Sequence, residues 1–131
     1  MNCSPPRALF DGYAFDLDGT VYLGDAALPG AVETIGRIRL AGRPVVFVTN
    51  NTLHTAEDYA GKLQGLGVEA TSADIVTATA ALVSYLKTAS PRGPLLVLGE
   101  TQLLRTLSAA GFALTTDGAV ADVVVVSFDR T

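Results

Sequence analysis

The sequence predicts an α/β protein built on a doubly wound parallel sheet. Apolar runs of strand length occur at residues 13–17, 45–48, 95–98 and 122–128, and helix-like segments separate them. Strand and helix alternate throughout, which favours βαβ units with right-handed crossovers. The run at residues 45–48 is apolar at every position, which predicts a strand covered on both faces of the sheet.

The first helix is expected to follow the turn at Pro29-Gly30, because apolar residues recur there at helical spacing. Gly42 is placed to cap the C-terminus of this helix. Thr55, followed three residues later by Asp58, predicts the N-terminus of a second helix with a loose capping box. Residues 20–28 show no clear period, so no element is predicted there.

A short strand is expected at residues 75–76, and it leads into a third helix. The strongest break in the chain follows this helix, at Ser90-Pro91-Arg92-Gly93-Pro94. We therefore expect residues 1–90 to form one unit, residues 91–94 to be a linker, and residues 95–131 to begin a second unit.

The last predicted strand, at residues 122–128, needs helices on both of its faces. A strand this apolar belongs inside a parallel sheet, where helices cover both of its faces. The sequence reaches Thr131 without another predicted helix. We therefore expect the chain to be part of a longer protein.

The composition is that of a compact globular protein, with 131 residues, 49% hydrophobic and 17% charged, and a formal net charge of −4. No run of Lys or Arg is present, so neither nucleic acid nor an anionic membrane is an expected partner. The N-terminus lacks the apolar core of a signal peptide, and no apolar run is long enough to span a bilayer. Cys3 is the single cysteine, so no internal disulfide can form, and a soluble cytoplasmic protein is expected.

Polar residues follow two of the predicted strands at the point where each strand ends. Asp16 and Asp18 follow the first strand, and Thr49-Asn50-Asn51 follows the second. Ligands of doubly wound sheets bind beyond the carboxyl ends of the strands, so both groups open into one crevice if the strands are neighbours. Two carboxylates repel an anionic substrate unless a cation lies with them, and oxygen ligands of this kind suit Mg²⁺.

A metal held by Asp16 and Asp18 could clamp a phosphoryl group whose oxygens accept hydrogen bonds from Thr49 and from loop amides. One carboxylate could attack phosphorus and form an aspartyl-phosphate, while the other acts as general acid and then as base. The simpler alternative for the two carboxylates is a polar strand end with a turn, and for Thr49 a plain strand terminus. Asn50 and Asn51 suit turn chemistry equally well.

The segment Asp16-Leu17-Asp18-Gly19-Thr20-Val21-Tyr22 is followed by Pro29-Gly30-Ala31, and then by Thr49-Asn50-Asn51 at the end of the next strand. Together these segments resemble the haloacid dehalogenase (HAD) superfamily, most of all its subfamily IIA, the NagD and 4-nitrophenylphosphatase-like phosphatases. The resemblance runs from about Asp11 to the end of the chain. It implies a Rossmann-like core, the beginning of an α/β cap domain, and a flap at residues 21–25.

By this resemblance, the chain is expected to be a Mg²⁺-dependent phosphatase of small phosphorylated metabolites. Asp16 is the expected nucleophile and a metal ligand. Asp18 is the expected acid and base, and it ligates the metal through its backbone carbonyl. Thr49 is expected to bind the transferring phosphoryl group, with Asn50 and Asn51 on the substrate side. A homo-oligomer formed through the cap is also implied.

The family further needs a lysine that neutralises the phospho-aspartate, and a later Gly-Asp motif that completes the metal site. Lys62 and Lys87 both lie in predicted helices outside the matching context, so neither is assigned the lysine role. A catalytically incomplete fragment, with no turnover of its own, is therefore the alternative function. His54 is expected to be a solvated residue before a helix, and Tyr59 a core residue.

Two other classes of protein fit less well. A phosphorelay receiver domain has a similar size and an acidic pocket, but it needs an aspartate at the end of a central strand. The strand at residues 45–48 leads instead into a threonine. A dinucleotide-binding domain needs a Gly-x-Gly-x-x-Gly turn after a strand, and the sequence has none.

Overall fold

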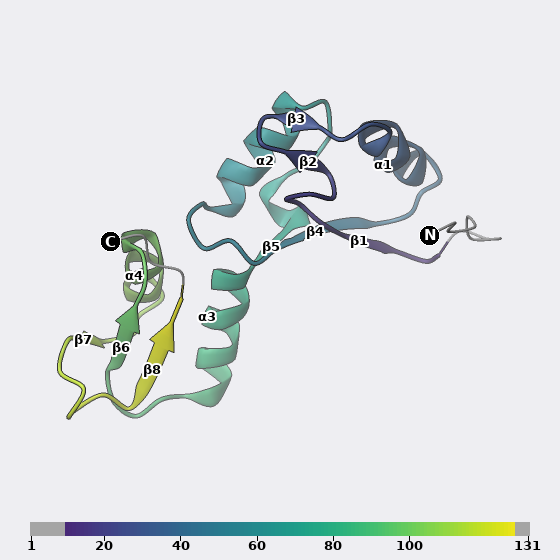
Figure 1. Cartoon of the computed structure of the whole chain (residues 1–131). Helices are drawn as coiled ribbons and strands as arrows, with labels where there is room; N and C mark the ends of the chain where they lie inside the picture. Colours follow the sequence, from purple (N-terminus) through teal and green to yellow (C-terminus); the bar gives the residue numbers. More distant parts are fainter. Residues whose placement is uncertain (1–9, 128–131) are drawn as a thin grey trace, which may run out of the picture.

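The computed structural model describes residues 10–127 and confirms the α/β class, with parallel sheets and helices (Figure 1). The elements follow in the order β1 (Tyr13–Asp16), β2 (Tyr22–Leu23), β3 (Ala26–Ala27), α1 (Ala31–Leu40), β4 (Val45–Thr49), α2 (Ala56–Gly65), a 3₁₀ turn (Ser72–Asp74), β5 (Ile75–Thr77), α3 (Ala78–Ala89), β6 (Leu95–Leu98), α4 (Thr101–Ala109), β7 (Leu114–Thr115) and β8 (Val123–Val126). Cys3 and the expected end of the last strand at Phe128 lie outside the described residues. Within residues 10–127, no helix combines the length and the apolar character needed to cross a bilayer.

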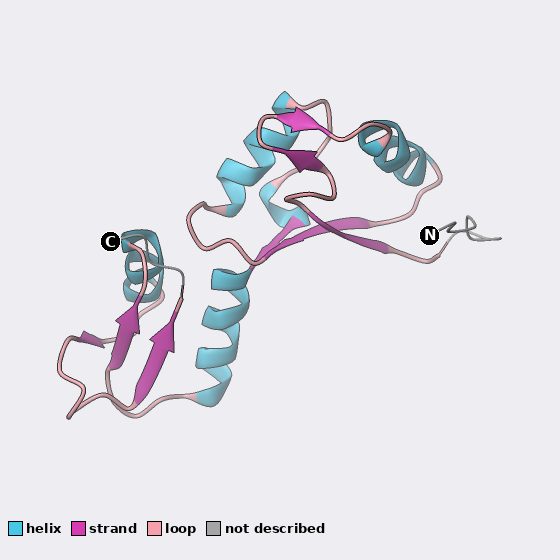
Figure 2. Cartoon of the chain, in the orientation of Figure 1, coloured by secondary structure: helices cyan, strands magenta, loops and turns pink. Residues whose placement is uncertain are grey.

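The first sheet is parallel and has the strand order β1-β4-β5. Its register places Asp16 opposite Val48, and Thr49 opposite Thr77. The strands β1 and β4 are therefore neighbours, and their carboxyl ends meet at one edge of the sheet (Figure 2). Sequence analysis expected the residues after these two strands to open into one crevice if the strands were neighbours. The pairing of β1 with β4 meets that condition.

Helices α1 and α2 pack in one buried cluster with the inner face of β4. Phe47 is fully buried in this cluster, whereas Val46 and Val48 are 38% and 42% exposed. Successive side chains of a strand point to opposite faces, and both helices occupy the Phe47 face. The expectation that residues 45–48 are covered on both faces is therefore wrong for the part of the chain that the structure describes.

The second sheet is also parallel, with the order β7-β6-β8. A second buried cluster joins this sheet to α3 and α4, and its members are Leu86, Leu95, Leu103, Leu107 and Val125. Because Leu86 belongs to it, α3 packs with elements that follow residues 91–94. The division into residues 1–90 and 95–131 stays a prediction. The sequence pattern missed β7, since two residues are too few to show a period.

An antiparallel hairpin of β2 and β3 follows the first strand. Gly24 lies at its tip with φ of +58°, a left-handed conformation that glycine adopts without steric cost. Each strand has two residues, so no alternation was visible at residues 20–28. The hairpin contains most of the residues that were expected to form a flap.

Helix α2 begins with the capping box that the sequence predicts. The Thr55 hydroxyl accepts a hydrogen bond from the Asp58 amide at 3.2 Å, and the Asp58 carboxylate accepts one from the Thr55 amide at 2.9 Å. These bonds from the backbone and side chain of Thr55 hold the pKa of Asp58 below its usual value. The first turn of α2, which borders the candidate site, is thereby fixed.

Thr55→Ala is expected to lower the free energy of unfolding by about 1 kcal/mol, because a helix-terminal amide loses its partner. Thr55→Ser keeps the hydroxyl and is expected to remain close to the unchanged protein. Urea unfolding followed by circular dichroism measures both variants. Equal stability of the Ala and Ser variants would contradict the role of this hydroxyl.

Candidate active site

The strand ends bring two of the predicted site residues to one edge of the first sheet. Asp16 is the last residue of β1, and Thr49 is the last residue of the neighbouring strand β4. Asp16 is exposed, while Thr49 is only 2% exposed. An exposed carboxylate and a buried hydroxyl thus lie at the edge where ligands of parallel sheets bind.

The turn after β1 holds Asp18 beside this edge. Leu17 is fully buried, and its carbonyl accepts hydrogen bonds from the amides of Thr20 and Val21 at 3.2 and 2.9 Å. Gly19 has φ of +80°, and its amide donates to the Tyr22 carbonyl at 2.8 Å. The glycine therefore permits a tight, anchored turn from which the Asp18 side chain is exposed.

The loop after β4 is held by its own polar side chains. The Thr49 hydroxyl accepts a hydrogen bond from the Asn51 amide at 3.2 Å, and the Asn51 side-chain oxygen accepts one from the Leu53 amide at 2.8 Å. Asn51 thus performs turn chemistry and also lines the pocket described next. Asn50 is exposed and does not line that pocket.

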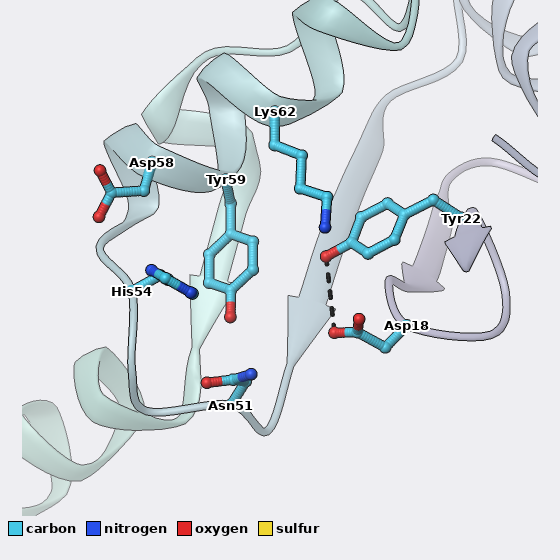
Figure 3. Close-up of a pocket in the computed structure, with 7 residues that line it drawn as sticks. All are labelled: Asp18, Tyr22, Asn51, His54, Asp58, Tyr59 and Lys62. Atoms are coloured by element: carbon cyan, nitrogen blue, oxygen red, sulfur yellow. Dashed lines mark hydrogen bonds between the residues drawn. The ribbon is translucent and has the colours of Figure 1, made fainter. Parts of the chain in front are cut away.

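A pocket of about 440 Å³ lies between this loop, the hairpin and α2 (Figure 3). Its lining residues are Asp18, Tyr22, Asn51, His54, Asp58, Tyr59 and Lys62. Of the predicted site residues, Asp18 and Asn51 lie here, while Asp16 and Thr49 lie at the adjoining strand ends. The sequence placed Tyr22 only within the expected flap, and it assigned no site role to Tyr59 or Lys62.

The helical spacing of Tyr59 and Lys62 could have indicated that both belong to the site. Tyr59 and Lys62 are three positions apart, so they share one face of a helix that starts just after the Thr-Asn-Asn loop. Tyr59 does belong to the buried core, as expected, and its ring also contacts His54 edge-on, with centroids 5.7 Å apart. His54 is exposed, which agrees with its expected place before the helix.

Tyr22 connects the hairpin to Asp18. Its side chain is almost fully buried, and its hydroxyl donates a long hydrogen bond of 3.5 Å to Asp18 Oδ2. Burial and the adjacent Asp18 carboxylate raise the pKa of Tyr22, so the phenol remains a neutral donor. Lys62 Nζ lies 4.0 Å from the centre of the Tyr22 ring, a cation–π arrangement that ties α2 to the hairpin.

Asp16 and Asp18 supply the carboxylate oxygens that could ligate the expected metal. Among residues 10–127, no group of three or more His, Cys, Asp or Glu side chains is arranged to hold a metal ion. Mg²⁺ in phosphoryl-transfer sites needs only one or two carboxylates, since it keeps several waters and takes phosphate oxygens. Asp16 and Asp18 fit such a site chemically, with water and substrate as the remaining ligands.

Comparison with known proteins supports the family. A profile of haloacid dehalogenase-like hydrolases matches residues 13–113. The acid sugar phosphatase of Staphylococcus aureus is 33% identical over 121 residues, which are 92% of this chain and 46% of that protein. The chain thus spans about half the length of the curated relatives it matches.

Two solved structures have the same arrangement of elements. The 4-nitrophenylphosphatase of Thermotoga maritima is 31% identical, with a TM-score of 0.80 over 92% of this chain and 46% of that one. The glycerol phosphate phosphatase of Mycobacterium tuberculosis, solved in complex with magnesium, is 31% identical, with a TM-score of 0.76 over 92% of this chain and 37% of that one. From the motif, the fold and the profile match together, the chain belongs to the haloacid dehalogenase-like hydrolase family.

Proposed function

We propose that this chain carries the nucleophile half of a Mg²⁺-dependent phosphatase that hydrolyses phosphoric monoesters of small metabolites through an aspartyl-phosphate. The observation that carries the proposal is the parallel pairing of β1 with β4, which sets Asp16 and Thr49 at one sheet edge. The turn at Gly19 adds Asp18 to the same place. The similar proteins named above are phosphatases, which supports this chemistry.

The proposed reaction assigns a step to each of these residues. The Asp16 carboxylate attacks phosphorus, the phosphoester bond breaks, and Asp18 gives a proton to the departing alcohol. Water then attacks the aspartyl-phosphate while Asp18 takes up the proton, and inorganic phosphate leaves. The Thr49 hydroxyl accepts a hydrogen bond from the Asn51 amide and also interacts with the Tyr59 hydroxyl, so a bound phosphoryl oxygen would take its proton in place of that second contact. Asp16 and Asp18 would hold Mg²⁺, which would supply positive charge to the phosphoryl oxygens.

A second candidate function is a catalytically incomplete fragment of such an enzyme. Val48 and Val76 lie close to the sheet edge that holds Asp16 and Thr49, and each is 42% exposed. No element of the described residues therefore covers this face of the first sheet. The match to only 46% of a curated relative points the same way. Three further expectations stay proposals. The partner is a small phosphorylated metabolite, a homo-oligomer forms through the elements after residue 95, and the protein is cytoplasmic.

Removal of the metal tests the proposal directly. Any hydrolysis of 4-nitrophenyl phosphate by the purified chain is expected to stop when EDTA is added, and to return when Mg²⁺ is restored in excess. The reason is that two carboxylates without a cation repel the phosphate dianion. Release of 4-nitrophenol measures the rate. Turnover that persists in EDTA would contradict the proposal, and no turnover at saturating Mg²⁺ would favour the incomplete fragment.

A further inference from the structure

A second polar pocket, of about 240 Å³, is lined by the loop after β4, by the first turns of α2 and α3, and by α4. Half of its lining residues are threonines, and its titratable residues are His54 and Glu57. Neither Asp16 nor Asp18 lines it, so the pocket is separate from the edge that holds the carboxylate pair.

Two helices present their N-termini to this pocket. In each of them the threonine before the first turn already accepts a hydrogen bond from the third amide, Thr55 from Asp58 at 3.2 Å and Thr77 from Ala80 at 3.1 Å. The first two amides of each helix have no partner within the helix. Two helix ends with partial positive charge therefore border one cavity, an arrangement that favours an anion.

Thr79 provides an independent sign of a ligand. It lines the pocket and is 8% exposed, and its hydroxyl is buried without a hydrogen-bond partner in the part of the chain that the structure describes. The hydroxyl of every other threonine in the lining makes a hydrogen bond. A helical threonine has two favoured side-chain rotamers, so this hydroxyl can turn toward an acceptor in the pocket. An unpaired buried hydroxyl is costly, and a ligand oxygen would satisfy it.

The remaining side chains define the kind of anion. Gln102 of α4 adds a neutral amide that can donate from the side opposite the two first turns. Glu57 is the carboxylate in the lining, and it is exposed, so its charge can stay in solvent while it still opposes an anion. Donors that come from three helices suit a tetrahedral oxyanion, because its several oxygens can each accept from a different helix.

We propose that this pocket binds a phosphate group at a site separate from Asp16 and Asp18. The first-turn amides of α2 and α3 and the Thr79 hydroxyl donate to its oxygens, and Gln102 donates to another. His54 also lines the pocket beside Asp18, so the two sites border the same loop. A phosphate bound here holds that loop against α3 and α4.

NMR titration of the whole chain with inorganic phosphate, in EDTA and without Mg²⁺, tests the proposal. Saturable shifts are expected at the amides of Ala56, Ala78 and Thr79. The amides of Asp18 and Gly19 are expected to stay unchanged, because two carboxylates without a cation repel the phosphate dianion. Sodium chloride at the same ionic strength controls for screening. Methyl phosphate, titrated in parallel, separates two sources that both support the site: binding of both ligands indicates the phosphate of an ester, and binding of inorganic phosphate alone indicates the free ion.

Matched variants test the two observations separately. Thr79→Val keeps the shape of the side chain and is expected to weaken phosphate about fivefold, whereas Thr79→Ser retains the affinity. Thr88→Val, at an exposed threonine later in α3, is expected to change nothing. Glu57→Gln is expected to tighten phosphate about threefold, and Glu33→Gln, exposed in the first turn of α1, to leave it unchanged.

Four results would overturn the proposal. They are shifts that chloride reproduces, no saturable shift with either phosphate ligand, an affinity that Thr79→Val leaves unchanged, and an affinity that Glu57→Gln does not raise. Asp16→Asn is expected to retain phosphate binding at this pocket. Loss of binding in that variant would place the ion at the carboxylate pair instead.

Discussion

Asp16→Asn is expected to lower the rate of Mg²⁺-dependent phosphoester hydrolysis at least about a thousandfold, because an amide cannot act as the attacking nucleophile. The substitution also removes one of the two carboxylates that fit the metal, so affinity for Mg²⁺ is expected to fall as well. Initial rates with 4-nitrophenyl phosphate and titration with Mg²⁺ measure the two effects. Asp16 is exposed at the end of β1, so its substitution leaves the buried core unchanged.

A matched control lies just before the same strand. Asp11 is an exposed carboxylate whose Oδ1 accepts from Arg43 Nη1 at 3.2 Å, and its substitution to Asn changes the net charge by the same amount. Asp11→Asn is expected to retain the rate within about twofold, since a surface ion pair contributes little. If Asp16→Asn kept more than a tenth of the rate, Asp16 would not be the nucleophile.

Phe47→Ala is expected to lower the free energy of unfolding by about 3–5 kcal/mol. Phe47 is fully buried in the middle of β4, the central strand of the first sheet, and it packs in the same cluster as α1 and α2. The lost side chain leaves a cavity that the paired strands cannot close easily. The free energy of unfolding of small domains is only about 5–15 kcal/mol, so this substitution removes a large fraction of it. Urea unfolding followed by circular dichroism gives the value.

The neighbouring valines of β4 test the reason for this effect. Val46 and Val48 lie on the same strand but remain 38% and 42% exposed. Their substitution to Ala is expected to cost less than about 1 kcal/mol each, because little buried surface is lost. A cost as large as that of Phe47→Ala would mean that the outer face of the sheet is covered in solution.

The parts of this molecule that the sequence predicted well are local. The helix at α2 begins at Thr55 with the expected capping box, since Thr55 and Asp58 are three residues apart and bond without help from distant segments. The turn at Gly19 and the strand leading into Asp16 are local in the same way. The carboxylate pair could be named because a strand that ends in two acids conflicts with burial unless it has a use.

Features that depend on long-range packing were missed. The apolar run at residues 45–48 does not reveal that α1 and α2 both lie on the Phe47 face. The position of Leu86 in a helix does not reveal which of the two clusters it joins. The hairpin at β2 and β3 is too short to leave a period, although it supplies Tyr22 to the pocket.

The sequence by itself predicted the α/β alternation, and it pointed to Asp16, Asp18 and Thr49 as polar residues at the ends of two strands. Only the tertiary structure decided that Tyr59 and Lys62 of α2 open into a pocket beside Asp18. The physical reason is that periodicity and capping arise from neighbours along the chain. Which helix face meets which loop depends instead on packing between segments far apart in sequence.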